Sequence, residues 1–223
     1  MQNIKQKYCK YIDKSLALIY NNNCYVTNVI ERRIYMPPKV KITADDIIKA
    51  AIELVRESGI DALNARALAK RLNCSTQPIF RDYRTMDEIK QLVLQKAYEI
   101  YVEYIHNAMR QNDYPPYKAS GMAYIRFANE ERQLFLLLFM RDRSAEQIPE
   151  KESLTDELTE LIAKGAGIDE KSAYRLQIEM WLLVHGIAAM AATNYLNITE
   201  NDASDMLTHA YKGLVRIFKE EQK

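Results

Sequence analysis

The sequence predicts an all-α protein in which an N-terminal three-helix domain with a helix-turn-helix precedes a larger C-terminal helical bundle. From Ile42 onward, helix-starting residues are repeatedly followed by apolar residues three and four positions apart. No stretch alternates apolar and polar residues as a half-buried β-strand does. Hydrophobic residues make up 48% of the chain, against 6 glycines and 6 prolines, so we expect a well-filled core.

The first 35 residues differ in composition from the rest. Residues 1–35 are rich in Tyr, Asn, Lys and Ile, and the run 21–23, all asparagine, interrupts any helical pattern. Met36 stands directly before two prolines and a clean helix start. One hypothesis is that Met36 is the true initiator and that the preceding segment is not native. The alternative is a native extension with a weak helix over Tyr8–Ile19, and the sequence favours neither.

Thr43 begins the first helix of the predicted three-helix domain. A threonine N-cap with Asp45 and Asp46 in the first turn satisfies free N–H groups and suits the positive end of the helix dipole. Gly59 can adopt the left-handed conformation that ends many helices. We therefore expect one helix between Thr43 and Gly59.

Two shorter helices follow, joined by a tight turn. Asn64 is a good N-cap for the second helix, and Asn73 can close it in place of glycine. Ser75 is predicted to cap the third helix, where Pro78 is tolerated because it lies in the first turn. Two short helices at this spacing predict a helix-turn-helix over residues 64–83.

The remaining chain is also predicted to be helical. Thr85 and Glu88 form a capping box for a longer helix that reaches about Met109. Residues 141–149 are polar and are expected to form a loop. The other predicted helices are Tyr117–Asn129, Glu131–Met140, one through Leu154–Ile162 that Gly165 or Gly167 ends, one from the Asp169 cap to Tyr195, and one from the Thr199 cap onward.

The predicted helix-turn-helix carries polar side chains where such units meet DNA. The start of its second helix, which enters the major groove, reads Ser75-Thr76-Gln77-Pro78, and Gln77 can pair bidentately with adenine. Arg66, in the first turn of the preceding helix, can reach guanine or the DNA backbone. Further phosphate attraction can come from Lys70, Arg71, Arg81 and Arg84. The alternative is that these are exposed polar residues of an ordinary helical hairpin.

Two runs within this region resemble the tetracycline-repressor (TetR) family. One extends from Ile42 through Gly59, and the other is Leu68–Tyr83. The resemblance covers the chain from Ile42 to about Tyr101. It implies a homodimer that binds a DNA operator, represses transcription, and releases the operator when a small molecule occupies the C-terminal domain.

The resemblance also implies which residues lie at double-stranded DNA. Carried over by position, Arg66, Thr76, Gln77, Pro78 and Phe80 would lie at the DNA. With the polar and basic residues of the motif and its neighbours, the full set of candidate DNA-contacting residues is Thr43, Asn64, Ala65, Arg66, Ser75, Thr76, Gln77, Pro78, Phe80, Arg81, Tyr83 and Arg84. Two residues depart from the family pattern: Phe80 stands where a tyrosine is common, and Met86 where a lysine is common. Both changes remove phosphate contacts, so we expect modest affinity or compensation from Arg81, Arg84 or the arm around Lys39 and Lys41.

A shorter element further along the chain resembles one TetR subgroup. Trp181-Leu182-Leu183-Val184-His185-Gly186 is similar to a Trp-x-x-x-His-Gly element of that subgroup. Trp181 and His185 are four residues apart and therefore share a helix face. The candidate residues for an effector pocket are Tyr101, Phe127, Phe135, Phe139, Trp181 and His185. The alternative is that these side chains are plain core, with His185 a partly buried, hydrogen-bonded histidine.

Small residues after Trp181 suggest a dimer interface. Gly186, Ala188, Ala189, Ala191 and Ala192 leave one side of the helix narrow enough for close approach by another helix. Packing of this helix and the last helix across a two-fold axis would form a four-helix interface. The candidate interface residues are Ala189, Ala192, Leu207, Ala210 and Leu214. The alternative is that the small residues pack inside one protomer.

The family resemblance and the helix pattern together divide the chain into three parts. We expect an N-terminal extension over 1–35, a TetR-type DNA-binding domain over 36–101, and a ligand-sensing and dimerisation domain over 102–223. The net charge of +1 is close to zero, so DNA binding must come from a local basic patch rather than from the whole chain.

Other function classes are disfavoured by what the motifs lack. The 3 histidines have no metal-spaced or triad-like companions, and no glycine-rich phosphate loop occurs, so we expect no catalytic residue, metal site or cofactor. The 3 cysteines lack disulfide or metal spacing, and no apolar run approaches the ~18 residues of a membrane span. We expect a cytoplasmic protein without a membrane partner. The remaining alternative is a helical protein-interaction module on a TetR-like scaffold with weakened DNA binding.

Overall fold

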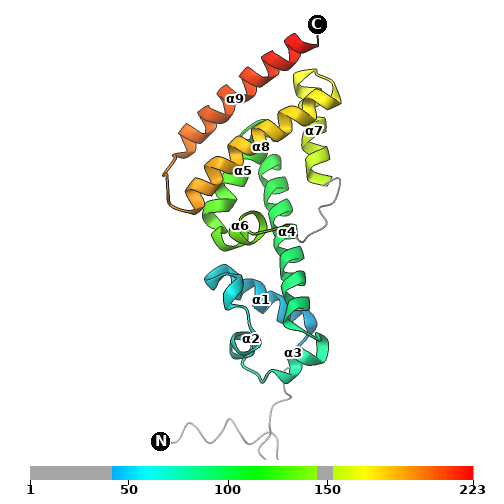
Figure 1. The fold of residues 1–223 in the computed structure, drawn as a ribbon, viewed down its shortest axis with the longest axis vertical. Coiled ribbons are helices and arrows are strands. Elements are labelled where there is room, and N and C mark those ends of the chain that lie inside the picture. Colours follow the sequence, from blue (N-terminus) through cyan, green and yellow to red (C-terminus); the bar gives the residue numbers. More distant parts are fainter. Residues whose placement is uncertain (1–41, 145–152, 223) are drawn as a thin grey trace, which may run out of the picture. The chain divides into compact units, whose positions relative to one another are not determined.

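The computed structural model describes residues 42–144 and 153–222. Within these residues every regular element is a helix, and Lys41–Lys223 form one compact unit (Figure 1). The hypotheses about Met36, the helix over Tyr8–Ile19 and the basic arm at Lys39 and Lys41 lie outside the described residues. No helix of the described residues is both long enough and apolar enough to cross a membrane.

The first helix, α1 (Ala44–Ser58), begins and ends as predicted. The Asp46 amide donates to Thr43 Oγ1 at 3.1 Å, and the Thr43 amide donates to the Asp46 carboxylate at 3.0 Å, which completes a capping box. At the other end, Gly59 has φ +78° and its amide donates to the carbonyl of Val55. A positive φ is accessible to glycine without the clash that a Cβ would cause. A one-turn 3₁₀ helix, η2 (Ile60–Ala62), follows.

The second helix, α2 (Ala65–Arg71), has both predicted asparagine caps. Asn64 Oδ1 accepts from the amides of Arg66 and Ala67 at 3.1 and 3.0 Å. Asn73 has φ +50°, its amide donates to the Lys70 carbonyl, and the next amide donates to the Ala69 carbonyl at 3.0 Å. This is the Schellman pattern, with asparagine in the place where glycine is usual. The turn after α2 is therefore fixed by backbone hydrogen bonds.

The third helix, α3 (Gln77–Asp82), differs from the prediction at its start. Ser75 does not cap it; the N-cap residue is Thr76, which has helical dihedral angles and no side-chain cap bond. Pro78 lies in the first turn, as expected, and helps to start the helix because its φ is already near the helical value. The fully buried side chain of Ile79 anchors α3 in the core.

A single long helix, α4 (Met86–Arg110), leads from this three-helix unit into the bundle and packs against both α1 and α5. Its cap is only partly as predicted. Thr85 Oγ1 accepts from the Glu88 amide at 3.2 Å, but the Glu88 carboxylate accepts from the amide of Arg84 instead of that of Thr85. The first bond of the predicted capping box is therefore present, and the second one, from the Glu88 carboxylate, reaches the amide one residue earlier.

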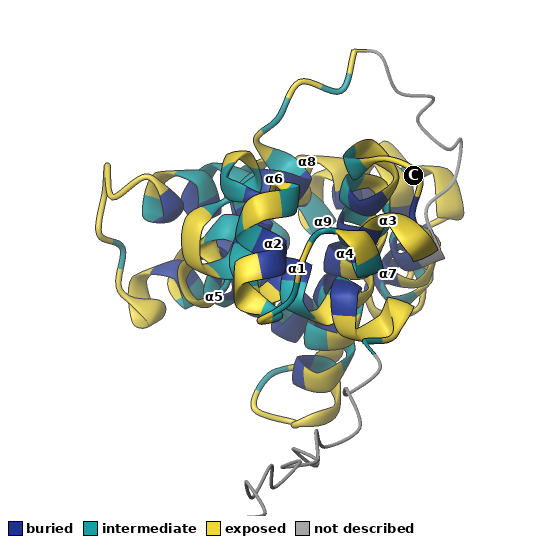
Figure 2. Ribbon diagram, turned by 90° about the horizontal axis from the view of Figure 1, so that it is seen from below, coloured by how far each residue is buried: buried dark blue, intermediate teal, exposed yellow. Residues whose placement is uncertain are grey.

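The C-terminal bundle consists of α5 (Pro116–Glu130), α6 (Arg132–Phe139), α7 (Ser153–Ala166), α8 (Glu170–Ala192) and α9 (Glu200–Glu221). Helix α5 lies at its centre and contacts α4 and the four other helices. Figure 2 shows that the buried residues lie where helices face one another and that the exposed residues lie on the outer surface. Predicted and observed helices agree except at boundaries.

Two helices of the bundle end at residues with positive φ: Gly167 was one of the two predicted ends of α7, and the end of α8 differs from the prediction. Gly167, with φ +67°, ends α7, so Gly165 remains inside the helix. Helix α8 stops at Ala192 rather than at Tyr195 because Asn194 adopts φ +55° and closes a second Schellman pattern with the carbonyls of Met190 and Ala191. An asparagine with positive φ follows three helices of the described residues, at Asn73, Asn112 and Asn194, and only the first was recognised in the sequence.

Candidate functional sites

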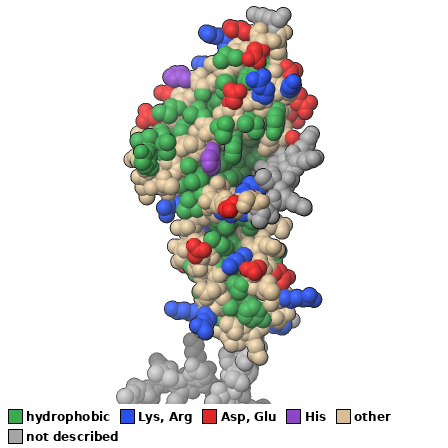
Figure 3. All heavy atoms as spheres, viewed as in Figure 1, with side chains coloured by type: hydrophobic (Ala, Val, Ile, Leu, Met, Phe, Trp, Pro, Cys, Tyr) green, Lys and Arg blue, Asp and Glu red, His purple; other side chains and the backbone are tan. Residues whose placement is uncertain are grey.

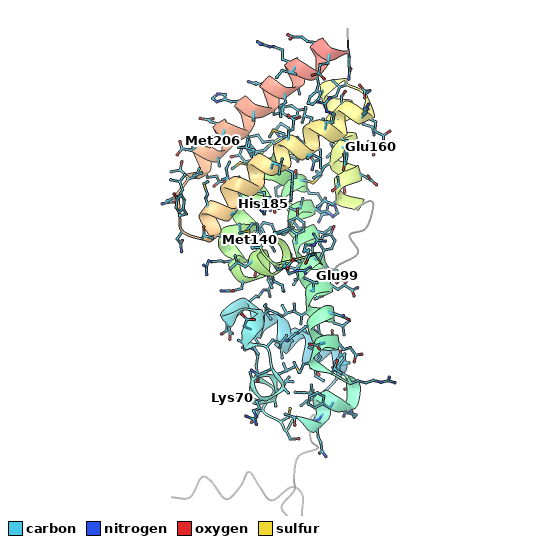
Figure 4. The ribbon with its side chains drawn as sticks, viewed as in Figure 1. Lys70, Glu99, Met140, Glu160, His185 and Met206 are labelled. Atoms are coloured by element: carbon cyan, nitrogen blue, oxygen red, sulfur yellow. The ribbon has the colours of Figure 1, made fainter. Side chains whose placement is uncertain are left out.

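The helix-turn-helix presents a group of exposed polar and basic side chains. Arg66 and Lys70 on α2, Ser75 in the turn, Gln77 on α3 and Arg84 after it are all exposed. Figure 3 shows Lys and Arg side chains projecting outward over α2 and α3, and Figure 4 shows Lys70 pointing away from its helix. Among the described residues, Arg66, Lys70 and Arg84 have no ion-pair partner. Their charges therefore remain available for an anionic partner.

Two other arginines of this unit are engaged within the protein. Arg71 forms a two-bond ion pair with Glu57 on α1, at 2.6 and 2.8 Å. Arg81 pairs with the neighbouring Asp82 and also donates to the Ile42 carbonyl at 2.8 Å. The Arg71 pair attaches α2 to α1, and the Arg81 bond attaches α3 to the residues just before α1. The predicted phosphate role of these two arginines therefore competes with interactions that hold the unit together.

Tyr83 is placed differently from the other predicted DNA-contacting residues. Its side chain is only 9% exposed, and its hydroxyl donates to the carbonyl of Ala44 at 3.1 Å. Burial, with nearby carboxylates second, raises the pKa of this hydroxyl, so it remains a neutral donor. Tyr83 fixes the end of α3 against the start of α1 instead of lying on the exposed polar surface.

The remaining predicted DNA-contacting residues are divided between two roles. Thr43 and Asn64 use their side chains as helix caps, and Ala65 and Thr76 are half-buried. Phe80 is 46% exposed, an unusual position for a large apolar ring, whereas Met86 is half-buried at the start of α4. The structure brings the predicted residues onto one unit, but their side chains do not form one uniform surface.

A cavity of about 660 Å³ lies among α4, α5, α7, α8 and α9. Its inner wall consists of buried side chains, among them Tyr101 of α4, Tyr124 of α5 and Met180 of α8. Exposed residues at the start of α5, the end of α7 and the middle of α9 line its outer part, including Pro116, Gly165 and Lys212. A volume of this size lies within the range of small-molecule sites.

Only part of the predicted pocket lines this cavity. Tyr101 and Trp181 do. Phe127, Phe135 and Phe139 do not line it; they pack with Tyr101 and Tyr124 in an aromatic cluster of the core, with ring centroids 5.1–5.8 Å apart. For these phenylalanines the core alternative describes the structure.

His185 lies one layer behind the cavity. Its Nδ1 is 2.9 Å from the hydroxyl of Tyr124, which itself lines the cavity, and its ring stacks on Trp181 at 5.2 Å between centroids. Burial lowers the pKa of His185 and so favours the neutral ring, whose tautomer sets the direction of the hydrogen bond with Tyr124. Figure 4 shows His185 on α8. The histidine positions a cavity residue rather than lining the cavity itself.

Several cavity residues were missed in the sequence. Tyr117, Lys118, Gln177, Tyr211 and Lys212 all line it. They come from a helix start, from α8 and from α9, so only packing of the bundle brings them together. The pocket prediction relied on the spacing of aromatic residues within individual helices, and that spacing identified residues of the core rather than residues of the cavity. No sequence pattern links a residue at the start of α5 to one on α9.

The predicted dimer interface is also only partly exposed. Ala192 and Leu207 are 1% and 3% exposed and pack inside the protomer, as in the alternative interpretation of the small residues. Ala189, Ala210 and Leu214 are half-buried. Figure 3 shows hydrophobic side chains gathered on the surface of α8 and α9. The exposed large hydrophobic residues on these helices are Tyr174, Ile178, Trp181, Leu182, Met190, Met206 and Ile217.

Two glycines lie on these helices. A Cβ built on Gly186 of α8 or on Gly213 of α9 would meet no atom within 4 Å. Neither glycine is therefore required by packing inside the protomer. Both leave the helix surface low enough for another helix to approach closely.

In the described residues, a helix-turn-helix unit is joined by one long helix to a cavity-containing bundle. Residues 117–214 match a family model described as "Tetracyclin repressor-like, C-terminal domain". The predicted resemblance lies mainly in the preceding residues, so the two likenesses cover different parts of the chain. The matched part of the chain, less than half of its length, is similar to the C-terminal domain of tetracycline-repressor-like proteins.

Two solved structures are similar to this chain, and the first of them shares its fold. A TetR-like transcriptional regulator from Rhodococcus sp. RHA1 has 19% identity and a TM-score of 0.56, with 75% of this chain and 93% of that chain covered. A TetR variant from Acinetobacter baumannii AYE in complex with minocycline has 13% identity and a TM-score of 0.48, covering 82% of this chain and 99% of that one. Among curated protein sequences, none matches this chain.

Proposed function

We propose that the protein is a non-enzymatic, ligand-responsive repressor that binds a palindromic DNA operator as a homodimer. The observation that carries the proposal is the group of exposed cations, Arg66, Lys70 and Arg84, on the same helix-turn-helix as Gln77. Because these cations have no ion-pair partner among the described residues, DNA phosphates can bind them without breaking an existing pair. The DNA-binding domain is proposed to span residues 36–101 and the sensing domain 102–223.

Each part of the reading unit has a distinct role in this proposal. The start of α3 enters the major groove, where Gln77 reads adenine, while Arg66 contacts guanine or phosphate. Lys70 and Arg84 bind phosphates and supply affinity without sequence preference. Arg81 and Tyr83 act mainly by attaching α3 to the residues around Ile42 and Ala44. Because Arg66, Lys70 and Arg84 lie on one helix-turn-helix, the near-neutral chain has a local basic surface there.

The homodimer is supported by the exposed apolar surface of α8 and α9. Leu182 is 58% exposed, and Ile178 and Met190 lie on the same side of α8 at intervals of four and eight residues. Met206 and Ile217 add apolar surface from α9. Large exposed apolar patches mark interaction sites. Two protomers joined here would supply the two reading units that a palindromic operator requires.

Effector binding is proposed to act through α4. Tyr101 and Ile105 of α4 line the cavity, and the same helix begins at Met86, three residues after the C-cap of α3. A ligand that binds one position of α4 more tightly than another shifts the protein toward that position. The spacing of the two reading units in the dimer would then change, and the operator would be released.

A protein-interaction module is the alternative function, and one observation favours it. Phe80 places an exposed ring on α3, and a hydroxyl able to bond phosphate is missing there. An exposed aromatic ring is a common feature of protein interfaces. Under the repressor proposal, Phe80 instead makes only apolar contact with DNA, and affinity is modest.

Selection of binding sequences from a random duplex library tests the proposal. The full chain is incubated with the library at physiological salt, and bound duplexes are amplified and sequenced over several rounds. We expect enrichment of one sequence with two inverted half-sites. A protein that retains duplexes without sequence enrichment, or retains none, would remove the repressor function and leave the interaction module.

A further inference from the structure

The charged groups of the cavity are all of one sign. Lys118 of α5, Lys164 of α7 and Lys212 of α9 line it, and none of the described residues that line it is Asp or Glu. Lys164 pairs with Glu160 outside the cavity, at 2.5 Å. Lys212 has no ion-pair partner among the described residues. The outer part of the cavity therefore has a positive potential that no lining carboxylate offsets.

The start of α5 adds to this positive potential. Its first turn contains Tyr117 and Lys118, both of which line the cavity, and no side chain makes a cap bond there because the N-cap residue is Pro115. The N–H groups of a first turn have no acceptor within the helix and carry partial positive charge. Lys118 is held beside them, since its ammonium donates to Thr208 Oγ1 at 2.8 Å and lies 4.8 Å from the Tyr114 ring centre.

The inner part of the cavity is apolar with one unsatisfied polar group. Tyr101, Met180, Val184 and Leu207 supply buried apolar surface. Gln177 also lines the cavity and is only 6% exposed, and its buried Oε1 has no hydrogen-bond partner among the described residues. Buried polar atoms nearly always have a partner, so an occupant with a hydroxyl or N–H group would satisfy this oxygen.

We infer that the effector is an amphipathic organic anion. Its charged group binds at the outer part of the cavity, against Lys118, Lys212 and the first turn of α5. Its apolar body extends inward toward Tyr101, and a donor along that body reaches Gln177. The inference rests on the proposed function of the cavity as an effector site, and it names the chemical class that the site selects.

A matched pair of fluorescent probes tests the charge preference. 1-Anilinonaphthalene-8-sulfonate and N-phenyl-1-naphthylamine share the aromatic body and the N–H group and differ only in the sulfonate. Both are titrated into the full-length protein, and their dissociation constants are compared. We expect the sulfonate to bind about tenfold more tightly, because each of two partly exposed charge pairs contributes up to a few-fold. Equal or tighter binding of the neutral probe would overturn the inference, and so would the absence of binding by both.

Lysine variants assign the preference to this cavity. In K118Q/K212Q we expect the preference for the sulfonate to disappear while the affinity for the neutral probe is unchanged. The control K171Q/K219Q removes the same charge from exposed positions outside the cavity and should keep the preference. A preference that survives K118Q/K212Q, or that both double variants lose equally, would show that the anion binds elsewhere.

A DNA measurement separates this inference from the proposed function. Binding of the unmodified protein to its selected operator is measured in parallel. Intact operator binding without an anion preference overturns only the ligand class. An anion preference that persists in a protein without operator binding overturns the repressor function and supports the cavity assignment alone.

Discussion

The guanidinium group of Arg56 on α1 holds the carboxylate of Glu131, which precedes α6. Nε and Nη2 of Arg56 lie 3.0 and 2.9 Å from the two carboxylate oxygens. The next residue, Arg132, donates to the carbonyl of Ala192 at the end of α8 at 2.5 Å. The adjacent side chains of Glu131 and Arg132 thus connect α1 with α8, the helix that carries Trp181 and His185.

Loss of the Arg56 contact is expected to lower stability. In R56Q the half-buried Glu131 carboxylate loses a two-bond partner, so we expect the free energy of unfolding to fall by about 1–2 kcal/mol. The measurement is urea unfolding at neutral pH. K49Q is the control, because it breaks the pair between Lys49 and Asp45, both of which are highly exposed, and should change stability by less than about 0.5 kcal/mol. Equal effects of the two variants would contradict a structural role for Arg56.

The asparagine cap of α2 should contribute measurably to the stability of the helix-turn-helix. Because N64A leaves two amides without their acceptor, it should cost about 1 kcal/mol of unfolding free energy. N64S keeps a capping oxygen and should retain most of the stability. The check is thermal unfolding of both variants beside the parent protein, and similar losses in the two would mean that capping is not the cause.

The dimer proposal makes a prediction in which the protomer and the assembly respond differently. A leucine in G186L meets no neighbouring atom at its Cβ and replaces a helical glycine, so the protomer should fold. The same side chain would hold a second helix away, and light scattering should show a shift from dimer toward monomer. E160L adds an equally large side chain to an exposed position of α7 and should leave the mass unchanged. A fully dimeric G186L protein would place the interface elsewhere.

The environment of His185 predicts a loss of stability on mild acidification. Burial lowers the pKa of His185 below its ordinary value of 6.5 in the folded protein, so the unfolded chain binds the proton more readily. Stability should therefore fall as the pH decreases through about 6.5 toward the folded-state value. Melting temperatures at pH 7.5 and pH 5.5 are compared for the parent protein and H185Q. The decrease should be smaller in H185Q, and identical decreases would exclude a contribution from His185.

The sequence predicted most of the helices because their ends are encoded locally. Thr43, Asn64, Asn73, Asp169 and Thr199 each act within a few residues of themselves, and all five cap a helix end in the structure. Ser75 failed as a cap because the chain already has helical dihedral angles at Thr76. Local hydrogen bonding explains both outcomes.

The cavity was less predictable because it depends on how whole helices pack. Tyr117 and Tyr211 lie far apart in the sequence, yet their rings are 5.6 Å apart at the outer part of the cavity. Phe127 and Phe135 are aromatic residues at helical spacing, as pocket residues can be, but both are completely buried and belong to the core. A helical pattern identifies the inward side of each helix and does not say which inward residues leave a space between them.

The most direct test of DNA reading is the ratio of affinities for the selected operator and for a random duplex. Fluorescence anisotropy at fixed salt gives this ratio for the parent protein, R66A and Q77A. We expect each variant to lose roughly 1–3 kcal/mol of operator binding, with Q77A leaving random-duplex binding nearly unchanged. A ratio that stays at the parent value in both variants would contradict the assignment of α2 and α3 as the DNA-reading helices.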